Sequence, residues 1–209
     1  MAQSKLVYVH DPMCSWCWGY APSWLKLKAV LESKLVVEYK VGGLAPDSQD
    51  PMPQNMQDML QNTWHKIAAQ LGTEFNFDFW RNCKPRRSTY PACRAALIAR
   101  KAGKESAMVA AIQQAYYLNA QNPSDESTLI SLAEQIGLNK AQFANRLQSK
   151  ELNDELIAEL NYVHSLPIQG FPSLVLINEG SAYPIAINYT DWQKTCLLYT
   201  SPSPRDMRR

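Results

Sequence analysis

Two cysteines separated by two residues, Cys14 and Cys17, are the residues of this sequence best suited to chemistry. They follow residues 6–10, a β-branched and aromatic stretch that predicts a short buried strand. A Cys-X-X-Cys pair directly after a strand and at the start of a helix is typical of a redox site. The helix terminus should stabilise the thiolate of Cys14, the nucleophile in thiol–disulfide exchange. We therefore expect an exposed, attacking Cys14 and a buried, resolving Cys17 one turn later.

The alternative is that the pair forms half of a zinc site, which requires a second pair of ligands. Cys83 and Cys93 are ten residues apart, and the histidines at positions 10, 65 and 164 are scattered. This spacing favours a redox pair, and we expect no metal.

A second motif, Gly170-Phe171-Pro172, precedes an apolar stretch at residues 173–177. Beside a redox pair, a cis bond before Pro172 would turn the preceding backbone toward the cysteines, where it can bind an extended substrate. The alternative is a trans proline that opens an edge strand. With Trp16, which offers an apolar face, Phe171 and Pro172 are our candidate substrate-binding residues.

The elements around these motifs follow from periodicity. A strand at 6–10, a helix at 14–32 that contains Pro22, and a strand at 35–41 predict a βαβ unit. Helical patterns then continue to about residue 164, with Ser124 and Asn139 as N-caps and Gly137 as a helix stop. Strands return at 173–177 and 183–187 around a turn at 178–180, and a final helix opens at 190–192.

The fold class is therefore α/β, a small domain interrupted by an all-helical insertion. We assign residues 1–45 and 165–197 to the α/β domain and 46–164 to the insertion. Residues 198–209 contain two prolines and no apolar pattern, so we expect a non-native tail. Cys196, which borders the tail, is left out of the functional reasoning.

The composition narrows the classes of partner. The chain has 209 residues, five cysteines and a net charge of +2, which is too mild to indicate a nucleic-acid or membrane partner. Its first apolar stretch is too short for a signal-peptide core, and no stretch approaches the roughly 18 apolar residues of a membrane span. We expect a cytoplasmic protein whose cysteines are thiols or a redox pair.

The strand–Cys-X-X-Cys–helix start, the helical insertion and the Gly-Phe-Pro motif together resemble the DsbA family of the thioredoxin-fold superfamily. The stretches around Cys14–Cys17 and residues 86–94 resemble its cytosolic, FrnE-like branch of disulfide oxidoreductases and isomerases. The resemblance implies a thioredoxin fold, exchange with protein or peptide disulfides through Cys14 and Cys17, and a cis bond at Pro172. It implies no resident cofactor, and glutathione is an alternative electron partner. A glutathione-dependent isomerase or transferase of the kappa-class or hydroxychromene-carboxylate isomerase type is the second hypothesis, although that group typically has serine at the position of Cys14.

Two further features leave alternatives open. Cys93 lies near the basic residues Lys84, Arg86, Arg87 and Arg94, where it is either a second reactive thiol or a buried small hydrophobe. The basic cluster itself either holds a carboxylate, from glutathione or an acidic substrate, or forms a solvated face. Several aromatic residues either line a groove or fill the core, and the core is the commoner fate: Trp16, Trp18, Trp64, Trp80 and Tyr90.

Overall fold

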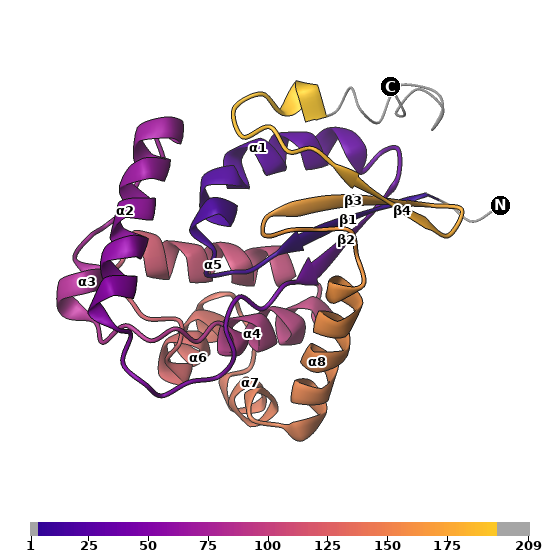
Figure 1. Cartoon of the computed structure of the whole chain (residues 1–209). Coiled ribbons are helices and arrows are strands. Elements are labelled where there is room, and N and C mark those ends of the chain that lie inside the picture. The colour runs from indigo at the N-terminus through magenta and orange to yellow at the C-terminus, as the bar shows by residue number, and fades with distance from the viewer. Residues whose placement is uncertain (1–3, 196–209) are drawn as a thin grey trace.

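A four-stranded mixed sheet lies between the helix that follows its first strand and a layer of other helices (Figure 1). The computed structural model describes residues 4–195, so the tail at 198–209 and Cys196 lie outside the described residues. The elements, in chain order, are β1 (Lys5–His10), α1 (Ser15–Leu31), β2 (Val36–Val41), α2 (Gln54–Leu71), α3 (Phe79–Asn82), α4 (Tyr90–Lys101), α5 (Glu105–Tyr117), α6 (Glu126–Gln135), α7 (Lys140–Leu147), α8 (Lys150–His164), β3 (Ser173–Asn178) and β4 (Ser181–Ile185).

The order of strands in the sheet is β2-β1-β3-β4. β1 pairs parallel to β2, with Lys5 opposite Val36, and this confirms the predicted βαβ unit. β3 pairs antiparallel to both β1 and β4. The site motifs therefore meet at one place, because β1 ends just before the cysteines and its antiparallel partner β3 begins just after Pro172.

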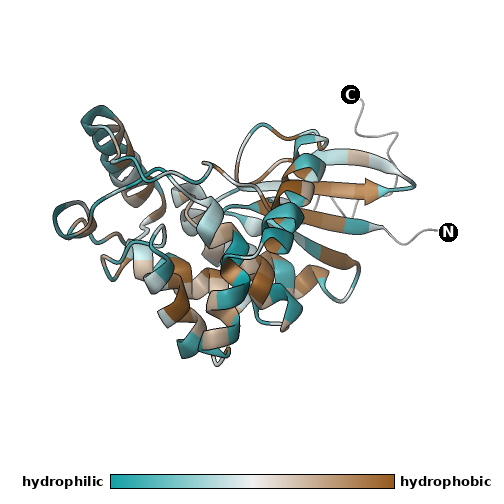
Figure 2. Ribbon diagram, turned by 90° about the horizontal axis from the view of Figure 1, so that it is seen from below, coloured by the Kyte–Doolittle hydropathy of each residue, from teal (hydrophilic) through white to brown (hydrophobic). Residues whose placement is uncertain are grey.

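The two faces of the sheet are buried against different helices, as the period of two in β1 requires. Leu6 and Tyr8 pack with Trp24 and other residues of α1 on one face. Val7 and Val9 pack with Val163 of α8 on the other. Figure 2 shows hydrophobic residues along the central strands, whereas hydrophobic and hydrophilic residues alternate along the helices.

The helices between β2 and β3 have a core of their own, built around Trp64, Phe79, Tyr116 and Tyr117. Met13, from the turn before α1, belongs to the same cluster, so the turn that leads to the cysteines is anchored in the core of the helical layer. The division of the chain at residues 45 and 164 stays a prediction. Within residues 4–195, no helix is both long and apolar enough to span a membrane.

Two predicted boundaries are wrong. Ser124 does not cap α6, because the helix begins one residue later than predicted and its N-cap is Asp125. The Ser124 hydroxyl donates instead to the carbonyl of Ser88. The last strand begins at Ser181 and ends at Ile185, two residues earlier at each end than predicted. Glu179 and Gly180 both have positive φ, and this tight turn sets the register by placing Ser181 opposite Asn178. The cap at Asn139 is confirmed, since its side chain accepts from the backbone N–H of Gln142 at 2.9 Å.

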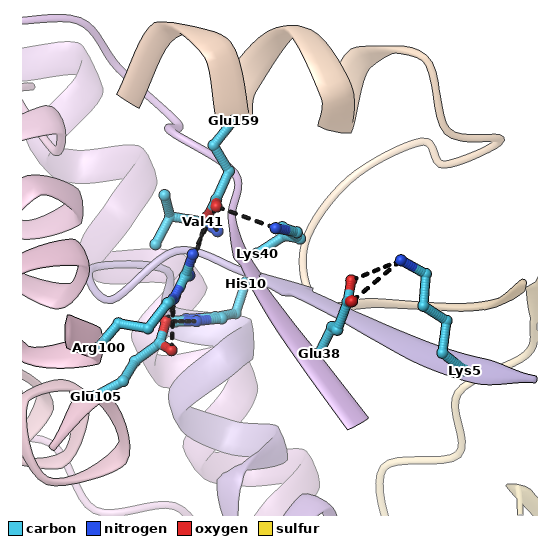
Figure 3. Close-up of polar contacts among 8 residues, drawn as sticks. All are labelled: Lys5, His10, Glu38, Lys40, Val41, Arg100, Glu105 and Glu159. Atoms are coloured by element: carbon cyan, nitrogen blue, oxygen red, sulfur yellow. Dashed lines mark hydrogen bonds and ion pairs between the residues drawn. The ribbon is translucent and has the colours of Figure 1, made fainter. Parts of the chain in front are cut away.

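A partly buried network of charges ties the C-terminal ends of β1 and β2 to the helical layer (Figure 3). The Arg100 guanidinium on α4 donates to Glu105 on α5 and to Glu159 on α8, at 2.6–3.0 Å. Glu159 also accepts from the backbone N–H of Val41 at 2.7 Å, and Glu105 lies 3.9 Å from the imidazole of His10. This network holds the C-terminal ends of β1 and β2, and the cysteine motif follows directly after β1.

Candidate active site

Cys14 occupies the N-cap of α1 and begins its backbone ladder by accepting from the N–H of Trp18 at 3.0 Å. A tight turn delivers it there, with the N–H of Cys14 bonded to the carbonyl of Asp11 at 3.0 Å. No acidic residue lies in the first turn of α1. The positive end of the helix therefore acts on the sulfur without an adjacent carboxylate on the same turn.

Cys17 is one turn further along α1 and 1% exposed, as predicted. Both cysteines are free thiols. Burial raises the pKa of Cys17 well above its usual value, and a hydrogen bond with Cys14 raises it further. Cys17 therefore remains a protonated thiol at neutral pH, one turn after Cys14 on the same helix.

Cys14 is more buried than predicted, with 6% of its surface exposed. The carbonyl of Phe171 lies 3.5 Å from its sulfur and covers one side. On another side, Cys14 lines an open cavity of about 290 Å³. Access to the sulfur is therefore through this cavity and not across a free surface.

The loop before β3 reaches the cysteines through the Phe171–Pro172 bond, which is cis, as the resemblance implied. The Phe171 ring lies directly on Gly42, because a Cβ added at Gly42 would be 2.2 Å from the ring. Gly42 in turn is bonded to β1 through the carbonyl of His10 at 2.6 Å. The close approach at Gly42 thus sets the position of the carbonyl that contacts Cys14.

Asp11 is a site residue that the sequence reasoning missed. Its fully buried carboxyl group accepts from the backbone N–H groups of Met13 and Leu44, both at 2.8 Å, and from the hydroxyl of Thr89 at 2.7 Å. It joins the cysteine turn, the segment after β2 and the start of α4. An aspartate followed by proline at a strand end is a turn signal, and that signal was available in the sequence.

Cys93 is the buried hydrophobe of the two alternatives. It is fully buried at the start of α4, and its thiol lies 3.6 Å from the Asp11 carboxyl. Burial and the charge of Asp11 raise its pKa well above the usual value. Its environment therefore disfavours the thiolate, despite the basic residues nearby in sequence.

The aromatic residues divide between core and cavity. Trp64 is a core residue, and Trp18 and Trp80 pack against the same cluster. Trp16 lines the cavity beside Cys14 and meets the ring of Tyr189 edge-to-face at 5.2 Å. Tyr90 packs between α4 and α8.

Residues 4–195 contain no group of three or more histidine, cysteine, aspartate or glutamate side chains arranged to hold a metal ion. In this range, then, the cysteine pair has no second pair of ligands of the kind that a structural zinc site needs.

The model of the DSBA-like thioredoxin domain matches residues 5–190, which include the cysteine pair, the helical layer and the cis-proline loop. The chain belongs to the DSBA-like thioredoxin domain family. This shows the thioredoxin-like fold and confirms the resemblance drawn from the sequence. The general class that goes with this family is thiol–disulfide oxidoreductase.

Solved structures share this fold over nearly the whole chain. A candidate protein disulfide isomerase from Nitrosomonas europaea is 27% identical, with a TM-score of 0.81 over 95% of this chain and 96% of that one. The cytosolic disulfide reductase DsbM from Pseudomonas aeruginosa is 23% identical, with a TM-score of 0.72 over 94% and 97%, and this likeness shows the fold.

Among curated proteins, the ClpXP adapter protein SpxH of Halalkalibacterium halodurans is 25% identical over 81% of this DSBA-like chain. The match spans 57% of that relative's own length. The rest of the adapter protein lies outside the match.

Proposed function

We propose that this DSBA-like chain is a thiol–disulfide oxidoreductase that acts on protein and peptide disulfides through Cys14 and Cys17. The observation that carries the proposal is the placement of one thiol at a helix N-terminus, where it borders a cavity, and of a second, buried thiol one turn later on the same helix. Family membership supports the reaction class.

The exchange proceeds in two balanced steps. The Cys14 thiolate attacks one sulfur of a substrate disulfide, the S–S bond breaks, and the released substrate thiolate takes up a proton. Cys17 then loses its proton and attacks the Cys14 sulfur of the mixed disulfide, which releases the second substrate thiol. Two electrons pass to the substrate and a Cys14–Cys17 disulfide remains. In the reverse direction, the same disulfide oxidises a substrate dithiol.

Substrate binding is assigned to Trp16, Phe171 and Pro172. Trp16 and Phe171 border the cavity at Cys14, and Pro172 holds the loop whose carbonyl contacts the sulfur. An extended segment that carries the disulfide can bind to this backbone while its side chain enters the cavity.

The reaction as proposed uses no metal or organic cofactor. A low-molecular-weight thiol, with glutathione as our proposed electron partner, would reduce the Cys14–Cys17 disulfide after each turnover. The reductase DsbM, which shares the fold, has been solved with GSH and is described as cytosolic. We propose a cytoplasmic location for this chain as well.

The test is a disulfide-reduction assay with insulin as substrate and dithiothreitol as electron source. Cys14→Ser should abolish the protein-dependent rate. Cys83→Ser is the matched control and should keep it, because the Cys83 thiol donates to the carbonyl of Ala120 at 3.0 Å and does not line the cavity. Unchanged turnover in Cys14→Ser would contradict the proposal, and a glutathione-dependent conversion of an aromatic substrate would favour the isomerase or transferase hypothesis.

A further inference from the structure

The cavity beside Cys14 is lined by positive charge. The charged residues that line it within the described chain are Arg86 and Arg87, and none of the lining residues is acidic. The rest of its wall is largely apolar, including Met13, Met52 and Phe171. A net charge of only +2 over the whole chain makes this local bias a property of the site and not of the protein.

The structure separates the basic residues that are clustered in the sequence. Arg94 forms a two-point ion pair with Asp47 at 2.7 and 2.8 Å. Arg86 donates to Asp125 at 2.5 Å and to the carbonyl of Ser124 at 2.8 Å. These two guanidinium groups are neutralised by the protein itself.

Arg87 differs from both. It is exposed, lines the cavity and makes no ion pair or side-chain hydrogen bond with any described residue. A second cation lies nearby, since the Lys66 ammonium is 6.0 Å from the Trp16 ring centroid and Trp16 also lines the cavity. A guanidinium at the wall of an acid-free cavity binds a carboxylate better than any neutral group.

We propose that Arg87 is a specificity-determining residue that binds a carboxylate on the substrate, one residue away from the disulfide cysteine. The preferred substrate is then an extended peptide segment in which an acidic residue neighbours the cysteine. The apolar wall accommodates the remaining side chain. This inference rests on the proposed exchange at Cys14 and specifies which disulfides react fastest.

The experiment uses the reduced full-length protein in single-turnover reactions with three symmetrical peptide disulfides. The peptides are capped dipeptides of cysteine followed by glutamate, glutamine or lysine. Samples quenched with acid at successive times give the second-order rate constant for each peptide. Each constant is divided by the rate at which 2-mercaptoethanol reacts with the same peptide, which removes the intrinsic effect of the peptide charge on exchange.

For the unaltered protein, the normalised rate constant should be about fivefold higher for the glutamate peptide than for the glutamine peptide, and lowest for the lysine peptide. Arg87→Gln should reduce the glutamate preference to less than about twofold, and Arg87→Glu should invert the order. Lys84→Gln removes a cation from the same segment that does not line the cavity, and it should keep the preference.

Equal rates for the three peptides, or an Arg87→Gln variant that keeps the preference, would refute the inference while leaving the exchange reaction intact. A loss of preference in Lys84→Gln as well would mean that the overall field, and not Arg87, selects the substrate. Failure of the proposed function gives a different pattern, because no peptide would then react faster with the unaltered protein than with Cys14→Ser.

Discussion

Replacing Arg100 with methionine should destabilise the fold by breaking the network that ties the sheet to the helical layer. The change removes four hydrogen bonds, two to Glu105 and two to Glu159. The side chains of these glutamates are only 11% and 8% exposed, so two carboxylates are left close together and short of partners. Removing one partner of a buried ion pair typically costs about 3–5 kcal/mol.

We expect the lower end of that range, about 3 kcal/mol, because part of the network survives. Glu159 keeps Lys40 at 3.3 Å and the N–H of Val41 at 2.7 Å. Urea unfolding followed by tryptophan fluorescence measures the change. With a slope of about 2–3 kcal/mol/M, the midpoint should fall by about 1 M.

The matched control is Arg81→Met, because the Arg81 side chain is 74% exposed and pairs only with Asp78. It should change stability by less than about 0.5 kcal/mol. If Arg100→Met shifts the unfolding midpoint no more than Arg81→Met does, the network does not hold the ends of β1 and β2 in place and the reasoning fails.

The pH dependence supplies a second test of the network. Burial alone raises the pKa of Glu105, but its interactions with His10 and Arg100 outweigh burial and lower the pKa below its usual value. A carboxyl group with a lowered folded-state pKa contributes stability above its unfolded pKa, and the contribution is lost as the pH falls through the folded-state value. The difference in unfolding free energy between the unaltered protein and Arg100→Met should therefore narrow as the pH falls below 4.5, the usual pKa of a glutamate. A gap that stays constant would contradict this assignment.

Three further changes test the site. Gly42→Ala should displace the Phe171 ring, lower the free energy of unfolding by about 1–3 kcal/mol and slow exchange at Cys14. The control is Gly170→Ala, which has open space at its Cβ and should leave the exchange rate within about twofold. Equal exchange rates in the two variants would contradict the contact between Gly42 and Phe171. Asp11→Asn should lower the free energy of unfolding in urea by about 2 kcal/mol, because an amide nitrogen replaces one of the two accepting oxygens. An unchanged unfolding midpoint would refute the role of Asp11. The reduced protein should lose stability as the pH rises from 8 to 10, because thiols with raised folded-state pKa values stay protonated while the thiols of the unfolded chain ionise. Cys93→Ala should lose less stability over this pH range. An equal loss in the variant and the unaltered protein would contradict the raised pKa of Cys93.

Local signals sufficed for most of the fold. The β-branched and aromatic stretch at residues 6–10 and the turn at 178–180 are properties of short segments, so the βαβ unit and the terminal hairpin could be predicted from them. Ser124 shows the limit of such reasoning. A serine before an apolar helical pattern has the chemistry of a cap, but the helix begins after Asp125. The Ser124 hydroxyl donates instead to the carbonyl of Ser88, which is 36 residues away in sequence.

The same distinction applies to the site. The positions of Cys14 and Cys17 follow from their spacing after a strand, and Pro172 follows from the resemblance. The role of Asp11 depends on Leu44 and Thr89, which only the folded chain brings to it. The sorting of the basic cluster is likewise a tertiary result, since Asp47 and Asp125, which neutralise Arg94 and Arg86, lie 47 and 39 residues from them in sequence.

The exchange chemistry is tested most directly by equilibrating the protein in glutathione redox buffers, quenching with an alkylating agent and mapping the cysteines by mass spectrometry. We expect one disulfide, between Cys14 and Cys17, that appears in a single two-electron transition, while Cys93 remains a free thiol throughout. A transition that links other cysteines, or a Cys14 that stays reduced in every buffer, would contradict the proposed exchange.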